Sequence, residues 1–180
     1  GFDVRCTGGR AWHAECVIVT TGGVSVPKLG ANDSGMGLCE VFGHQRTDLR
    51  PGLVPLKSDD TTVRRMRGVR VWAKVSAQGA GGRQIEDTDD LLFTRYGVSG
   101  FTILNLSARL VPMLSQGPQD LHISLLPDDT AEMASEMLLA RWQRHPHRTL
   151  GLSFAGLLHW KVARPLLESL SLNPDEPVSQ

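Results

Sequence analysis

The chain has 180 residues, of which 41% are hydrophobic, and this length supports one ordinary domain or two small ones around a packed core. Its 19 basic and 19 acidic residues cancel, so no overall field draws the protein to a nucleic acid or an anionic membrane. No apolar run approaches the roughly 20 residues that span a bilayer, and no secretion signal opens the chain. We therefore expect a cytoplasmic protein whose partners include neither a nucleic acid nor a membrane.

The N-terminal region predicts a hairpin followed by a short helix. Residues 2–6 and 12–20 have the composition of two strands around the turn at 7–10. Residues 35–42 can form a short helix, because Gly43 follows as a stop signal.

A candidate cofactor site lies where an apolar strand runs into glycine. Residues 17–20 (Val-Ile-Val-Thr) predict a buried strand, and Thr21, Gly22 and Gly23 follow it. Glycine lets the backbone approach a ligand closely, and amide donors at such a strand end can face a phosphate or ribose oxygen of a dinucleotide. An ordinary strand-to-loop turn would use the same residues.

The middle of the chain predicts a small antiparallel sheet or barrel-like unit. Apolar residues alternate with Arg70, Trp72 and Lys74 over 69–75, which is the period of a half-buried strand, and a glycine turn follows at 79–82. Further strands are expected at 90–93, 101–106 and 121–125.

After Pro127 the pattern becomes helical. A helix capped by Asp128 or Asp129 is expected through about Arg144, and a second over about 153–159. Pro165 suits the first turn of a third helix, and residues 171–180 suit a linker. The fold class is therefore α+β, with an antiparallel β-rich part and a small helical part.

Other candidate functional residues have plain structural explanations. His44 could act as a general acid or base, or it could bond to the carbonyls at a helix end. The acidic run from Glu86 to Asp90 lacks the pattern of a calcium loop and is expected to be a solvated loop. The three cysteines lack metal-ligand spacing, so no metal site is expected and the thiols should be reduced and mostly buried.

A basic cluster could bind phosphates. It comprises Arg64, Arg65, Arg67 and Arg70, with Trp72 close by in the sequence. The alternation of the strand places Arg70 and Lys74 on an outward face, which favours a solvated surface instead.

Several spaced motifs, taken together, resemble the BaiN/YhiN-type family of bacterial flavoproteins, which are NAD(P)/FAD-dependent oxidoreductases. They occur in the family's order at residues 20–23, 25–30, 32–35, 43–44, 51–56 and 93–101. The chain departs from the family pattern in three places: Asp33-Ser34 replaces Gly-Asp, Arg95 replaces His and Phe101 replaces Pro.

The resemblance implies a partial FAD-binding (Rossmann-type) segment over 1–56, a β-rich insert over 57–127, and a helical subdomain with a linker over 128–180. The insert would cover the flavin and shape the cavity of a small-molecule substrate, and Thr21, Gly22 and Gly23 would lie near FAD. The pyrophosphate fingerprint Gly-x-Gly-x-x-Gly is absent, so the resemblance places the rest of the FAD domain on either side of this chain. The fragment alone would be inactive and would bind little flavin.

NAD(P)H is a further cofactor in such enzymes, while the catalytic residues are not identified. The alternative function is a free-standing, non-catalytic β-rich module that binds a protein or an anionic ligand.

Overall fold

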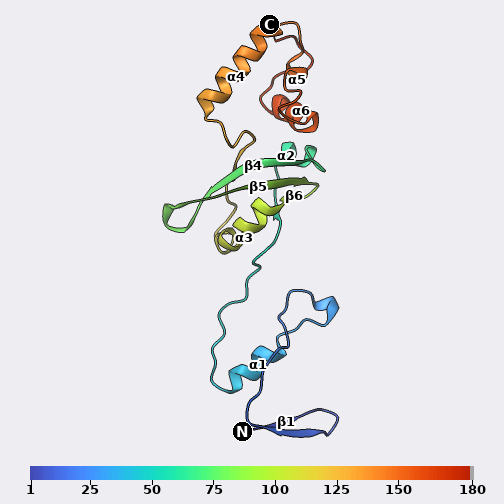
Figure 1. Ribbon diagram of the computed structural model, residues 1–180, viewed down its shortest axis with the longest axis vertical. Helices are drawn as coiled ribbons and strands as arrows, with labels where there is room; N and C mark the ends of the chain where they lie inside the picture. The colour runs from blue at the N-terminus through green and yellow to red at the C-terminus, as the bar shows by residue number, and fades with distance from the viewer. Residues whose placement is uncertain (179–180) are drawn as a thin grey trace. The chain divides into compact units, whose positions relative to one another are not determined.

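The computed structural model describes residues 1–178, which divide into two compact units, one of residues 1–49 and one from Arg50 onward. The first unit contains a hairpin and a helix (Figure 1). Strands β1 (Phe2–Arg5) and β2 (Ala11–Ala14) pair antiparallel, with Val4 opposite Trp12. The predicted hairpin therefore forms, but its second strand ends at Ala14 and does not continue to residue 20. A short 3-10 turn, η1 (Pro27–Leu29), precedes helix α1 (Ser34–Val41).

The expected buried strand at residues 17–20 does not form. This segment is coil, and Ile18 is 85% exposed. A strand requires a neighbour to which its amides and carbonyls can bond, and none of residues 1–178 pairs with this segment. The apolar sequence alone therefore does not give a strand here.

The second unit is built on a five-stranded antiparallel sheet in the order β3-β6-β5-β4-β7. Its strands are β3 (Leu56–Lys57), β4 (Arg70–Gln78), β5 (Gln84–Thr94), β6 (Gly97–Ser99) and β7 (His122–Ser124). The turn η2 (Ala80–Gly82) joins β4 to β5, as the glycine run predicts. Ala73, Val75 and Ala77 are buried at alternate positions of β4, because one face of the strand faces the core.

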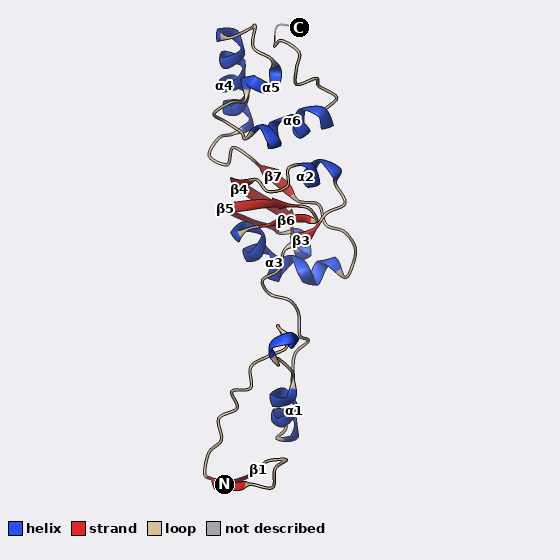
Figure 2. Cartoon of the chain, turned by 90° about the vertical axis from the view of Figure 1, so that its right-hand side faces the viewer, coloured by secondary structure: helices blue, strands red, loops and turns tan. Residues whose placement is uncertain are grey.

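Residues 101–106, predicted as a strand, are instead the start of helix α3 (Phe101–Leu114). Ile103, Leu106 and Leu110 are at most 1% exposed and recur at helical spacing. They pack in one cluster with Val75, Leu91 and Phe93 of the sheet. The β-branched start of the segment suggested a strand, but a helix is the conformation that buries these three side chains together. Figure 2 shows α3 against one face of the sheet.

The remaining helices are α2 (Thr61–Arg65), α4 (Ala131–Arg144), α5 (Leu150–Ser153) and α6 (Trp160–Ser169). The long C-terminal helix ends as predicted, but its cap is Thr130, whose hydroxyl accepts a hydrogen bond from the Met133 amide at 3.3 Å. The predicted second helix lies earlier in the chain, at α5. Pro165 stands in the middle of α6, because His159 caps the helix five residues further back than expected.

Two segments expected to be irregular are ordered. The acidic run from Glu86 to Asp90 belongs to β5, where Asp90 accepts a hydrogen bond from Arg70 on β4 at 3.0 Å. The tail packs back onto α5, since the Leu150 amide donates to the Glu176 carbonyl at 2.8 Å. The α+β class, with an antiparallel sheet and a helical part, is confirmed. None of the helices over residues 1–178 has the length and apolar character that a bilayer crossing needs.

Candidate functional site

The predicted cofactor segment is an open stretch of backbone. Thr21 and Gly22 are exposed, Gly23 is half-buried, and Gly22 adopts φ +76°, which favours glycine. Within the described chain, the amides of residues 17–25 have no hydrogen-bond acceptor. These donors are therefore available to a ligand.

Helix α1 fixes one side of this segment. A Cβ built on Gly35 would lie 1.9 Å from the Oγ1 of Thr21. Only a glycine at position 35 therefore lets the glycine segment lie so close to α1. Gly23 lies beside the same helix, where its Cβ would be 4.0 Å from the Cε of Met36. The strand-end residues are thus positioned by α1, although they form no strand.

Thr21, Gly22 and α1 line an open hollow of about 420 Å³. Two of the three predicted residues, Thr21 and Gly22, belong to it, and Gly23 does not. His44, which follows the helix stop at Gly43, also lines it. Sequence reasoning considered His44 but did not connect it with the glycine segment.

Arg46 also lines this hollow, and it was not singled out from the sequence. Its Nη1 lies 3.4 Å from Asp33 and its Nε 3.3 Å from Glu40, the two carboxylates at opposite ends of α1. Both pairs are largely exposed, so each contributes little to stability. A basic residue two positions after Gly43-His44 was the available signal.

The residues present fit a dinucleotide flavin in part. FAD carries phosphate, ribose and ring oxygens that accept hydrogen bonds, and the unpaired amides of the 17–25 segment are matching donors. A Cβ at Gly22 would meet nothing within 4 Å, so the backbone there is open to approach. The contacts are too few to hold the whole cofactor.

The family-like motif at 97–100 has a structural role in the sheet. Gly97 has φ +144°, and a Cβ there would lie 2.3 Å from the Leu56 carbonyl oxygen of β3. Gly100 has φ +93°, and a Cβ there would lie 2.3 Å from the Asp90 carbonyl oxygen of β5. Both glycines are therefore needed for the backbone to pass close to its neighbours, whereas Arg95 and Tyr96 between the strands are exposed.

Other candidates are not brought together. Over residues 1–178, no three His, Cys, Asp or Glu side chains are placed to share a metal ion. The three cysteines are free, as predicted, but Cys6 and Cys16 are exposed and not buried. They lie in the small first unit, which has too little core to cover them.

The comparison with protein families decides the assignment. The model described as "HI0933-like protein barrel and H2TH domain" matches residues 50–180. The chain belongs to this family. This confirms the resemblance to the BaiN/YhiN-type flavoproteins that the spaced motifs indicated.

Three relatives have names that describe an activity. A 3-dehydro-bile acid delta(4,6)-reductase of Clostridium scindens is 30% identical over 183 positions, covering 100% of this chain and 44% of the relative. A ribosomal RNA dihydrouridine synthase of Escherichia coli is 29% identical, covering 100% of the chain and 42% of the relative. A ribosomal RNA dihydrouridine synthase of Haemophilus influenzae is 31% identical, covering 87% of this chain and 37% of the relative. This HI0933-like chain thus spans under half the length of each relative.

Proposed function

We propose that the whole protein is a FAD-dependent oxidoreductase, and that this chain supplies part of its FAD-binding domain together with the insert. Residues from 50 onward would cover the flavin and shape the substrate cavity. Membership of a flavoprotein family supports the redox assignment. The single observation that carries the role of this chain is the run of unpaired amides at Thr21–Gly23 beside α1.

In this proposal Thr21, Gly22 and Gly23 bind FAD through their backbone. FAD, when bound, supplies the electron transfer that amino-acid side chains cannot perform. The chain's own residues position it: Gly35 lets Thr21 lie against α1, and Gly22 adopts the positive φ that turns the amides outward. NAD(P)H as the reductant belongs to the same proposal.

The first unit would pack against the rest of the same FAD domain. Its apolar hollow of about 700 Å³ is lined by Phe2, Val4, Val17, Val19, Leu38 and Phe42, with some polar neighbours. Ile18 and Val41 are 85% and 80% exposed, which is unusual for side chains of this size. The relatives are more than twice as long as this chain, so such a protein has the further segments that would cover this surface.

The substrate is proposed to be a small molecule, as the resemblance to the flavoprotein family implies. The relatives' names do not choose between a small molecule and a polymer: one names a bile acid and two name ribosomal RNA.

The competing function is a non-catalytic module for an anionic ligand, and one observation favours it: five basic side chains line a hollow between α2 and α6. The two functions are separated by purifying the whole protein, without added cofactor, and recording its absorbance. Bands of protein-bound flavin would support the oxidoreductase. A colourless protein that does not take up added FAD would favour the module.

A further inference from the structure

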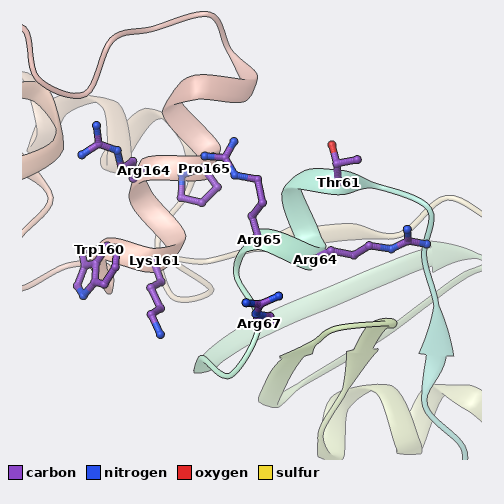
Figure 3. A pocket seen from close by; sticks show the side chains of 8 residues that line it. All are labelled: Thr61, Arg64, Arg65, Arg67, Trp160, Lys161, Arg164 and Pro165. Atoms are coloured by element: carbon purple, nitrogen blue, oxygen red, sulfur yellow. The ribbon is translucent and has the colours of Figure 1, made fainter.

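A second hollow, of about 550 Å³, lies in the second unit between α2 and α6, far along the sequence from the glycine segment. Five basic side chains line it: Arg64, Arg65, Arg67, Lys161 and Arg164. Figure 3 shows Arg65 extending from α2 toward Pro165, while Lys161 and Trp160 come from the start of α6. The sequence separates these two groups by roughly a hundred residues, so only the fold brings them together.

Carboxylates neutralise part of this charge. The Nη2 of Arg64 lies 2.8 Å from the Oδ1 of Asp59, and Arg65 pairs with Glu168. The Nε of Arg164 lies 3.1 Å from the Oε1 of Glu168, and its Nη2 lies 2.6 Å from the Oδ2 of Asp175. The shared use of Glu168 ties α2 to α6. Three carboxylates thus face five cations.

Arg67 and Lys161 are the two cations left in excess. Neither forms an ion pair with any residue over 1–178, and both are exposed. Lys161 has its ammonium 5.7 Å from the centre of the Trp160 ring. A cation held over an aromatic face is stabilised by the ring but keeps donors for an anion.

Trp160 gives the hollow an exposed aromatic face. Its side chain is 65% exposed, although tryptophan usually lies mostly buried. His159, whose Nδ1 accepts the Lys161 amide hydrogen at 3.1 Å to cap α6, stacks on it with ring centres 5.9 Å apart and planes 27° apart. The His159 ring thus lies against the indole, most of which is left open to a flat ligand.

We propose that this hollow binds a nucleotide, with its phosphate against Arg67 and Lys161 and its base against Trp160. Excess positive charge beside an exposed indole is the combination that recognises a phosphate joined to a flat heterocycle. A free dinucleotide and a single-stranded polynucleotide share this chemistry. The proposal does not depend on the flavin, because every residue in it belongs to the 50–180 unit.

The test measures equilibrium binding of three probes to the 180-residue chain at fixed low salt: NADPH, inorganic phosphate, and a short single-stranded oligonucleotide. We expect Trp160→Ala to weaken nucleotide binding about tenfold, as loss of one base stack does, and to weaken phosphate binding much less, since it removes only the support of Lys161. The double variant Arg67→Gln/Lys161→Gln should weaken all three probes.

Two matched controls use residues outside the hollow. Trp72→Ala removes an indole that is 54% exposed on β4, and Arg83→Gln removes an exposed cation at the end of the β4–β5 turn. Both should bind like the unchanged chain. Tighter binding of NADPH than of the oligonucleotide assigns the site to a free dinucleotide, and the reverse order assigns it to a polynucleotide. No binding of either, or binding that survives both the Trp160 change and the double variant, overturns the proposal.

Discussion

Thr21 occupies the space that a side chain at Gly35 would need, since a Cβ on Gly35 would lie 1.9 Å from the Thr21 Oγ1. Gly35→Ala should therefore push the glycine segment away from α1 and lower the flavin content of the whole protein. Gly37→Ala is the control on the same helix, because a Cβ there would meet nothing within 4 Å. That change should stabilise α1 by about 0.5–1 kcal/mol and leave flavin content unchanged. Equal flavin content in the two variants would contradict the role given to Gly35.

Ser107 of α3 is fully buried and holds the chain that enters the sheet. Its hydroxyl accepts from the Val54 amide at 3.1 Å, and two carbonyl oxygens lie within reach of its one hydrogen, that of Leu104 at 2.7 Å and that of Gly52 at 3.0 Å. Ser107→Ala should cost about 1–3 kcal/mol in the free energy of unfolding, because it removes the hydrogen-bond acceptor of the half-buried Val54 amide. The control is Ser115→Ala, at an exposed serine near the end of the same helix, which should lower the free energy of unfolding by less than about 1 kcal/mol. Chemical denaturation measures both changes.

Thr102 of α3 has a buried hydroxyl with no partner among the described residues. Thr102→Val keeps the shape of the side chain and removes the unpaired polar atom, so it should raise the free energy of unfolding by about 1 kcal/mol. The denaturation midpoint measures this directly. A destabilised Val variant would mean that the hydroxyl has a partner.

The link between α2 and α6 should depend on pH. The hydrogen bond from Arg65, with a further bond from Arg164, lowers the pKa of Glu168 below its usual range. A carboxyl whose pKa is depressed on folding contributes stability above its unfolded pKa, about 4.3, and loses it as pH falls through the folded value. The difference in stability between the unchanged chain and Glu168→Gln should therefore be constant from pH 7 down to about pH 4.3, shrink below it, and vanish once the pH lies below the folded pKa of Glu168. A difference that persists in acid would rule out this origin.

Local patterns predicted many of the elements, and the misses have physical causes. Alternation found β4, and capping and stop signals found α1 and most of α4. The helix at 101–114 was missed because its first residues are β-branched or aromatic, while its buried face becomes visible only with Leu106 and Leu110. Tertiary packing overrode local propensity there.

The two candidate sites differ in how much of each could be predicted from the sequence. Thr21 and Gly22 could be found because the glycine motif is local, and their contact with FAD stays a prediction. The hollow between α2 and α6 could not be found in this way. The basic cluster was recognised, but a solvated surface was favoured because Arg70 and Lys74 alternate along a strand. Arg64 and Arg65 instead lie on a helix and meet Lys161 and Arg164 only through the fold.

The backbone of Gly22 tests the flavin assignment most directly. Gly22 and Gly9 have nearly the same φ, +76° and +79°, and a Cβ at either would meet nothing within 4 Å. The positive φ strains a valine at either position, but Gly9 lies in the β1–β2 turn, outside the hollow. The measurement is the ratio of bound flavin to protein in the purified whole protein. We predict that Gly9→Val keeps the ratio of the unchanged protein and that Gly22→Val loses most of its flavin; equal ratios in the two variants would contradict the account.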